Sequence, residues 1–241
     1  ETLMHRGPDS GGVAVDPACR VAMGHRRLAI LDLSPEGHQP MRSASARWTV
    51  AFNGEIYNHR ALRAELAGAG VAFRGHSDTE VLVEAIDRWG LTPTLQRLNG
   101  MFAIAAADAA TGCLYLARDR LGEKPIYWTH QGDRFAFASE LRALRVVPGI
   151  RLDIDEHSVA SLLHLSYIPH PATIYEQVRQ AAPGSVVQVR VGEVSIEVST
   201  NQWWSLSNAL ETSLAARRPT TLDDAADELD ELLADAIGMR L

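Results

Sequence analysis

The first part of the chain alternates between strand-like and helix-like hydrophobic patterns. Apolar and β-branched residues occur in short runs that end in polar, turn-prone residues, and helical spacing follows. These patterns predict strands over Met23–Leu31 and Trp48–Ile56, then helices over His59–Ala69 and from Ser77 to Gly90. Ser77 and Glu80 form a predicted capping box, in which each side chain would accept a backbone N–H of the other residue.

From Met101 onward the pattern changes to pairs of short strands joined by turns. The predicted hairpins are Met101–Ala107 with Cys113–Arg118, Pro125–Thr129 with Arg134–Ala138, and Val186–Val191 with Val194–Ser199. Short helices are predicted between the hairpins, over Glu140–Val146 and Glu156–Leu165. Strands grouped into antiparallel hairpins, with helices between the groups, indicate an α+β layered fold and not a doubly wound parallel sheet.

The C-terminal part is predicted to be a linker followed by one amphipathic helix. The irregular stretch Asn201–Pro219 divides the chain into a domain over 1–200, a linker over 201–220 and a last helix over 221–241. Thr221 and Asp224 cap this helix. Its apolar face consists of Leu222, Ala225, Leu229, Leu232, Leu233 and Ile237. The helix either packs back on the domain or opens a second domain, and the linker before it favours the second alternative.

Composition narrows the functional classes. The 241 residues carry a net charge of −7, which argues against a nucleic-acid or anionic-membrane surface and suits a protein that binds small molecules. Cys19 and Cys113 lie far apart and match no paired-cysteine motif, which is typical of buried thiols in a reducing, cytoplasmic compartment. The histidines show no metal-ligand spacing, and no stretch is apolar enough to span a membrane, so neither a metal nor a membrane partner is expected.

Several polar residues have the chemistry that a site for free glutamine needs. A guanidinium such as that of Arg27 can pair with an α-carboxylate, and carboxylates such as Asp78 can bind an α-ammonium. The run Asn53–Glu55 combines a side-chain amide with a flexible glycine, which could stabilise a tetrahedral oxyanion. Taken singly, these residues are also typical of a surface charge, a first-turn acid and a turn, so their spacing leaves the site open.

A series of ordered motifs carries a family resemblance. The motifs are Arg6-Gly7-Pro8-Asp9, Gly24–Ile30, Gln39-Pro40, Phe52–Asn58, Ser77–Glu80, Leu98–Ala103, Arg118–Tyr127, Phe137–Glu140, Tyr167–Pro169 and Pro183-Gly184. In this order they resemble the asparagine synthetases, specifically their class II glutamine amidotransferase domain. The resemblance covers essentially the whole chain. It implies a four-layer αββα fold of the N-terminal-nucleophile type, with two antiparallel sheets between helical layers.

The resemblance also implies roles for individual residues. Arg27 would hold the glutamine carboxylate, and Glu55 and Asp78 its ammonium. The Asn53 side chain and the Gly54 N–H would form the oxyanion hole. The backbone of Leu28, Ala29, Ile30 and Leu31 would line the pocket, and Arg6 and Asp9 would support it from a neighbouring loop. The Arg118–Tyr127 and Phe137–Glu140 motifs are interpreted as holding the fold together.

One feature departs from the family pattern. Family members attack glutamine with the thiol of an N-terminal cysteine whose free α-amine is the base. The first residue here is Glu1, and neither Cys19 nor Cys113 has a free amine. The first strand of the family is also missing, which would expose a sheet edge. The chain is therefore interpreted as a fragment, because it retains the glutamine-binding residues; the alternative is a domain that truly lacks the nucleophile.

These observations lead to one main function and two alternatives. The main hypothesis is a glutamine-hydrolysing asparagine synthetase, which forms a cysteinyl thioester and passes ammonia to aspartate or a similar acid. ATP and magnesium would bind in a following synthetase domain and no cofactor in this one. Ser10-Gly11-Gly12 is interpreted as a glycine turn and not as the ATP-binding loop. The alternatives are a scaffold domain, as in β-lactam synthetases and lasso-peptide cyclases, and a glutamine sensor. The resemblance implies a homodimer.

Overall fold

The computed structural model describes residues 1–29, 34–216 and 221–240. Its strands are β1 (Ser10–Asp16), β2 (Val21–Arg27), β3 (Met41–Arg42), β4 (Trp48–Ile56), β5 (Gly100–Asp108), β6 (Cys113–Arg118), β7 (Tyr127–Gln131), β8 (Arg134–Ala138), β9 (Arg179–Gln180), β10 (Ser185–Val191) and β11 (Ile196–Gln202). The helices are α1 (His59–Gly68), α2 (Asp78–Trp89), α3 (Leu91–Arg97), α4 (Leu141–Leu144), α5 (Glu156–Leu165), α6 (Leu206–Ala215) and α7 (Leu222–Gly238). Two 3₁₀ turns lie at Met4–Arg6 and Pro35–Gly37.

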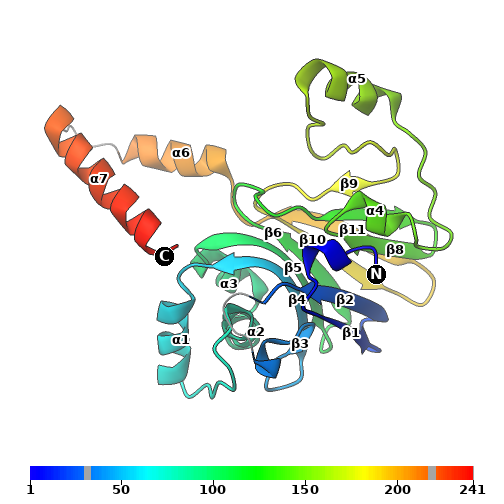
Figure 1. Cartoon of the computed structure of the whole chain (residues 1–241), viewed down its shortest axis with the longest axis horizontal. Helices are drawn as coiled ribbons and strands as arrows, with labels where there is room; N and C mark the ends of the chain where they lie inside the picture. The colour runs from blue at the N-terminus through cyan, green and yellow to red at the C-terminus, as the bar shows by residue number, and fades with distance from the viewer. Residues whose placement is uncertain (30–33, 217–220, 241) are drawn as a thin grey trace.

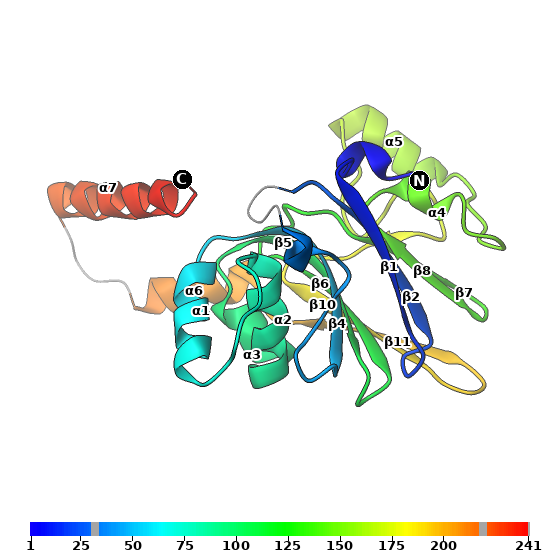
Figure 2. The same cartoon turned by 60° about the horizontal axis from the view of Figure 1, so that its bottom comes forward.

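The strands form two layers between helices, as predicted. One layer is a six-stranded sheet in the order β11-β10-β6-β5-β4-β3, and the other consists of the pair β1-β2 and the sheet β8-β7-β9. The strand pairs in these sheets are antiparallel. Helices α1, α2 and α3 cover one face of the six-stranded sheet, and α4 and α5 lie outside the second layer (Figure 1, Figure 2). The α+β, αββα prediction is thus confirmed, with the second sheet in two pieces.

Two hydrophobic cores hold these layers together. The first lies between the helices and the six-stranded sheet and includes the fully buried Leu66, Leu82 and Ile86. The second lies between the two strand layers and includes Met23 and Leu116. Strands β5 and β6 are buried almost throughout, because both faces of the six-stranded sheet are covered.

The long patterned elements occur where the sequence predicts them. Strand β4, strand β6, strand β8 and helix α5 have the predicted bounds. Helix α1 and strand β10 differ by one residue at one end, and β5 is one residue longer at each end. Helix α4 spans only Leu141–Leu144, β7 begins at Tyr127 and β11 spans Ile196–Gln202. Strands β3 and β9, the helix α3 and both 3₁₀ turns were not predicted, because short elements give weak periodic signals.

The predicted strand Met23–Leu31 is wrong at both ends. Strand β2 begins at Val21 and ends at Arg27, which pairs with Ser10 at the start of β1. Pro8 lacks a backbone N–H and cannot extend β1 further toward the N-terminus. The Ala29 N–H instead donates to the Asp9 carboxylate at 2.8 Å, so the chain leaves the ladder after Arg27.

The interpretation of Ser10-Gly11-Gly12 as a turn is also wrong. The three residues belong to β1 and pair with Arg27, Arg26 and His25 of β2. Glycine is needed because other segments pack closely here: a Cβ on Gly12 would lie 2.2 Å from the Gln39 carbonyl oxygen. Since the run lies in a paired strand, it is no loop that could wrap around phosphates.

The stretch interpreted as a linker contains regular structure. Strand β11 extends to Gln202, and α6 begins after Ser205, whose side chain accepts the Asn208 N–H. The capped helix α7 is confirmed, and Thr221 and Asp224 form both halves of its capping box. Its apolar face remains exposed, with Leu232 61% and Ile237 59% accessible, so α7 does not pack that face on the domain. Figure 1 shows α6 and α7 projecting from the body.

Candidate active site

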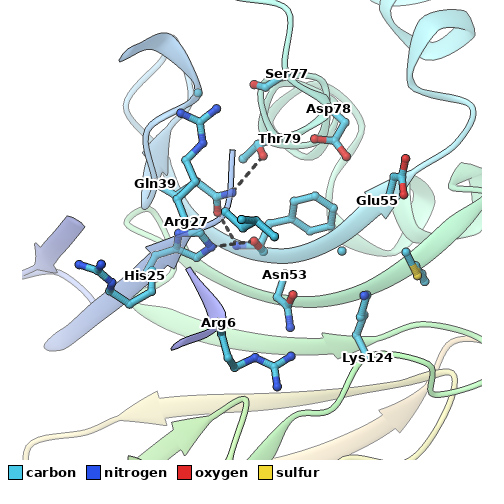
Figure 3. Close-up of a pocket in the computed structure, with 16 residues that line it drawn as sticks. Arg6, His25, Arg27, Gln39, Asn53, Glu55, Ser77, Asp78, Thr79 and Lys124 are labelled. Carbon is cyan, nitrogen blue, oxygen red and sulfur yellow. Dashed lines mark hydrogen bonds between the residues drawn. The ribbon is translucent and has the colours of Figure 1, made fainter. Parts of the chain in front are cut away.

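A pocket of ≈ 300 Å³ lies where the end of β4 meets the start of α2 and the end of β2. Figure 3 shows the side chains around it. The lining residues are Arg6, His25, Arg26, Arg27, Leu28, Gly37, Gln39, Phe52, Asn53, Gly54, Glu55, Ser77, Asp78, Thr79, Met101 and Lys124. The structure thus brings together most of the candidate residues named from the sequence. Asp9 and Ala29 lie outside this lining set, and Ile30 and Leu31 lie outside the described residues.

The edge of β4 presents its backbone N–H groups to the pocket at every second residue. Antiparallel strands direct successive residues to opposite sides of the strand, so Phe52, Gly54 and Ile56 point the same way. The Phe52 N–H donates to Gln39 Oε1 at 2.7 Å, and the Ile56 N–H donates to Asp78 Oδ2 at 3.1 Å. The Gly54 N–H between them faces the same side, away from β5, and none of the described residues accepts it there. A backbone donor is therefore available at this point of the pocket.

The neighbouring residues leave room only for glycine at position 54, and Asn53 adds a second hydrogen-bond donor next to it. A Cβ on Gly54 would lie 2.1 Å from the Met101 carbonyl oxygen, so no other residue fits between β4 and β5 here. The Asn53 Nδ2 atom is buried and has no hydrogen-bond partner in the described structure. Buried donors are normally paired, so two unpartnered donors on consecutive residues indicate a group that binds a ligand oxygen.

Asp78 and Glu55 form the acidic side of the pocket (Figure 3). Asp78 begins α2 directly after its N-cap, Ser77, whose hydroxyl accepts the Glu80 N–H. Burial raises the pKa of Asp78 above its ordinary value, and the nearby Glu55 carboxylate raises it further. Two carboxylates that disfavour each other's charge are a suitable site for an ammonium group.

Only half of the capping box predicted at α2 has the predicted partners. Ser77 accepts the Glu80 N–H as expected, at 3.2 Å. The Glu80 carboxylate accepts the backbone N–H groups of Arg74 and Gly75 at 2.8 and 2.9 Å. Glu80 therefore fixes the loop before α2, which in turn places Asp78.

Arg27 lies at the basic side of the pocket. Its Nη1 donates to the Ser34 carbonyl oxygen at 3.1 Å, and its guanidinium packs over Gly37, where a Cβ would lie 2.1 Å from Nη2. The loop with Arg6 and Asp9 packs against the same strand end, because the Asp9 N–H donates to the Arg27 carbonyl oxygen. Asp9 thus supports the strand end that bears Arg27, while Arg6 itself lines the pocket.

Gln39 and His25 line the pocket but were given no role from the sequence. Gln39 is buried and bridges two walls: its Oε1 accepts the Phe52 N–H and its Nε2 donates to Thr79 Oγ1 at 3.1 Å. His25 Nε2 lies 3.1 Å from the Phe52 carbonyl oxygen. Burial lowers the pKa of His25 to about 4, so the neutral imidazole donates through Nε2. Both residues occur in the family motifs, but only the fold shows that they form hydrogen bonds to the Phe52 backbone of β4.

The Arg118–Tyr127 motif holds the fold, as predicted, with one exception. The Asp119 carboxylate accepts N–H groups from Phe102, Leu121, Glu123 and Lys124. Arg118 donates to three backbone carbonyl groups. The exception is Lys124, whose side chain points into the pocket on the side of Asn53 (Figure 3).

The two cysteines are buried and reduced and lie in structural positions. Cys19 follows β1 in a turn, and its thiol donates to the carbonyl oxygens of Asp108 and Cys113. Burial raises the pKa of Cys19 to about 12, so its thiolate is not accessible at neutral pH. Neither Cys19 nor Cys113 lines the pocket.

Comparison with known proteins decides the family. A profile described as glutamine amidotransferase domain matches residues 1–204 of the chain. The chain belongs to the glutamine amidotransferase family. This chain is 32% identical over 244 residues to asparagine synthetase [glutamine-hydrolyzing] 3 of Bacillus subtilis, which covers 100% of this chain and 37% of that protein. It is 37% identical over 190 residues to asparagine synthetase [glutamine-hydrolyzing] 1 of the same organism, over 79% of this chain and 29% of the relative.

Solved structures show the same fold. The glutamine phosphoribosylpyrophosphate amidotransferase of B. subtilis superposes with a TM-score of 0.61 at 22% identity, over 84% of this chain and 45% of that one. The fold is therefore the N-terminal-nucleophile sandwich of the amidotransferases. The chain spans about a third of the length of the curated asparagine synthetases that it matches.

Within the described residues, no group of three or more His, Cys, Asp or Glu side chains is arranged to hold a metal ion. None of the helices in this part of the chain is both long enough and apolar enough to cross a membrane.

Proposed function

We propose that this amidotransferase domain hydrolyses glutamine as part of a glutamine-hydrolysing asparagine synthetase or a close amide-forming relative. The observation that carries the proposal is the unpartnered Gly54 N–H beside the unpartnered Asn53 amide, in a pocket with a guanidinium and two carboxylates. This set matches the polar groups of glutamine: Arg27 binds its α-carboxylate, Glu55 and Asp78 bind its α-ammonium, and the two donors bind its amide oxygen.

The nucleophile of the proposed reaction is an N-terminal cysteine on a strand that precedes this chain. A groove of ≈ 500 Å³ lies between β2 and β8 and is lined by Val21, Phe135, Phe137 and other apolar residues. The described strands pair β2 only with β1 and β8 only with β7, so both strands have an open edge. One further extended segment would satisfy open strand edges of this kind, which supports the proposal. The 241-residue chain by itself is then expected to bind glutamine weakly and not to hydrolyse it.

The proposed acceptor reaction takes place in a second domain that α7 opens. Ammonia would attack an aspartate, or a similar acid, that ATP and magnesium have activated as the acyl-adenylate. The exposed apolar face of α7, with Leu229 and Leu233 more than half accessible, supports a further domain at this end. The family resemblance extends the proposal to a cytoplasmic homodimer.

The test is the release of ammonia and glutamate from glutamine by the intact gene product. We expect hydrolysis by the wild type and a loss of on the order of a hundredfold in kcat/KM for Arg27→Ala, because the α-carboxylate loses its bidentate partner. A gene without a cysteine codon directly after the initiator would contradict the proposal. Glutamine binding without hydrolysis would then indicate a sensor, and no binding would indicate the scaffold alternative.

A further inference from the structure

Lys124 is the only lysine among the 23 lysine and arginine residues of the sequence. In a chain whose other cationic side chains are all arginine, this one lines the pocket of the proposed active site. The ammonium of lysine is a compact point charge, whereas the guanidinium of arginine is a wide planar fork. This pocket position is therefore the one place in the sequence where a lysine ammonium stands instead of an arginine guanidinium.

The backbone of Lys124 is fixed from both sides. Its N–H donates to Asp119 Oδ2 at 3.0 Å, and its carbonyl oxygen accepts Arg118 Nε at 2.9 Å. The same Asp119 oxygen accepts the Phe102 N–H at 3.2 Å, and Phe102 lies opposite Gly54 in the β4–β5 ladder. The buried Asp119 carboxylate therefore connects the backbone of Lys124 to the strand pair β4–β5, which bears Asn53 and Gly54.

The Lys124 ammonium differs from the neighbouring cations in its partners. Arg6 donates to the Glu140 carboxylate at 2.8 Å, and Arg26 donates to the Gly7 carbonyl oxygen at 2.9 Å. Within the described part of the chain, no hydrogen bond or ion pair engages the Lys124 ammonium. In Figure 3 it points into the pocket, toward the region between Asn53 and Glu55. A positive charge without a partner among the described residues thus lines the same pocket as the two unpartnered donors.

We infer that Lys124 binds the side-chain oxygen of the substrate and favours states in which that oxygen is negatively charged. The inference rests on the proposed function and assigns Lys124 to the same site. The oxygen of the side-chain amide is nearly neutral in glutamine. It gains a full negative charge when a nucleophile adds to the amide carbon. In the product glutamate it belongs to a charged carboxylate. A cation there stabilises the addition step and the product more than the substrate.

The consequence is a measurable preference for a γ-carboxylate over a γ-amide. We expect wild-type protein to bind glutamate at least as tightly as glutamine, because Lys124 attracts the additional charge. Lys124→Gln removes the charge at similar length, and we expect about a tenfold weaker affinity for glutamate with glutamine changed by less than about threefold. Lys124→Arg keeps the charge and should retain most of the glutamate affinity.

The experiment is calorimetric titration of the intact protein with glutamate and with glutamine, using a form in which the proposed cysteine is alanine so that glutamine is not consumed. Glu123→Gln serves as the matched control, since Glu123 is exposed, changes charge by one unit and does not line the pocket. In the active protein, Lys124→Gln should lower kcat for glutamine by about tenfold with little change in KM. Thermal unfolding of each variant checks that the fold is intact.

Equal losses for glutamate and glutamine in Lys124→Gln, or no loss for either, would overturn the inference. A glutamate-specific loss in Lys124→Arg as large as in Lys124→Gln would also overturn it, because charge would then not be the cause. Failure of the wild type to bind or hydrolyse glutamine would instead refute the proposed function, and the role of Lys124 with it. The two failures are thus distinguished by the wild-type measurement.

Discussion

Two regions of this molecule contain a buried carboxylate in opposite circumstances. In the Asp119 loop (residues 118–124), Asp119 is 1% exposed, and its two oxygens accept four backbone N–H groups. In the pocket wall (residues 53–55 together with Asp78), Asp78 is 6% exposed, and burial raises its pKa. The Asn53 amide and the Gly54 N–H of that wall have no protein partner among the described residues. In the Asp119 loop the carboxylate is fully hydrogen-bonded within the protein and stabilises the fold. The pocket wall has hydrogen-bond donors without a protein partner, which are available for a ligand.

The largest effect is expected in the Asp119 loop. Asp119→Ala leaves several buried N–H groups without an acceptor and should lower the free energy of unfolding by about 4 kcal/mol. Asp119→Asn retains one acceptor oxygen and should cost about half as much. Chemical denaturation of the 241-residue chain measures both values. Equal, small losses would show that the Asp119 loop does not stabilise the fold, and the comparison between the regions would fail.

The next effect is a pH dependence that originates in His25 beside the pocket wall. The pKa of His25 is lowered from 6.5 to about 4, chiefly by burial, with smaller effects from Arg27 and His38. The unfolded chain therefore binds more protons between these values, and stability is present above pH 6.5 and is lost as the pH falls toward 4. The contribution amounts to about 3 kcal/mol at most.

The variant His25→Gln isolates this contribution. Glutamine keeps an N–H donor for the Phe52 carbonyl oxygen but does not titrate, so the variant should lose less stability on acidification than the wild type. Denaturation midpoints at neutral pH and near the lowered pKa provide the measurement. Parallel losses in both proteins would show that His25 is not buried in its neutral form.

A smaller effect is expected at Gln39, which connects Phe52 of β4 to Thr79 of α2 next to the pocket wall. Gln39→Leu leaves the buried Phe52 N–H without an acceptor and should lower stability by about 2 kcal/mol. Gln39→Glu is the matched variant, because it still accepts the Phe52 N–H and can accept the Thr79 hydroxyl, so it should lose less. If both variants lost the same stability, the bridge through Gln39 would not explain the position of β4.

The smallest effect on stability is expected at Asp78. Asn keeps an oxygen that accepts the Ile56 N–H, while the buried charge is removed, so Asp78→Asn should change the free energy of unfolding by less than about 1 kcal/mol. Chemical denaturation next to the Asp119 variants makes the comparison direct. A loss as large as that of Asp119→Ala would mean that Asp78 holds the fold and is not reserved for a ligand.

The sequence predicts the fold well where hydrophobic periodicity is long. Strand β4 agrees at both ends, and the Ser77 cap of α2 is local chemistry that the structure confirms. The errors occur where distant residues decide the outcome. β2 ends at Arg27 because of Pro8 and Asp9, and the glycines of β1 are needed only because another segment packs on them.

The site shows the same division. The structure places Arg27, Asn53, Gly54, Glu55 and Asp78, which the family motifs single out, around one pocket. The pattern of motifs did not distinguish Lys124 from the residues around it, which hold the fold, because its side-chain direction depends on the Asp119 hydrogen bonds. The helix α6 was missed although Leu206, Leu210 and Leu214 have helical spacing, because the polar residues around them are typical of a linker.

The central claim is that the pocket wall is reserved for glutamine, and Asp78→Asn in the intact protein tests it most directly. We predict that kcat/KM for glutamine hydrolysis falls by on the order of a hundredfold, because the α-ammonium loses a charged partner, while the unfolding midpoint stays close to that of the wild type. An unchanged kcat/KM with a stable fold would contradict the claim.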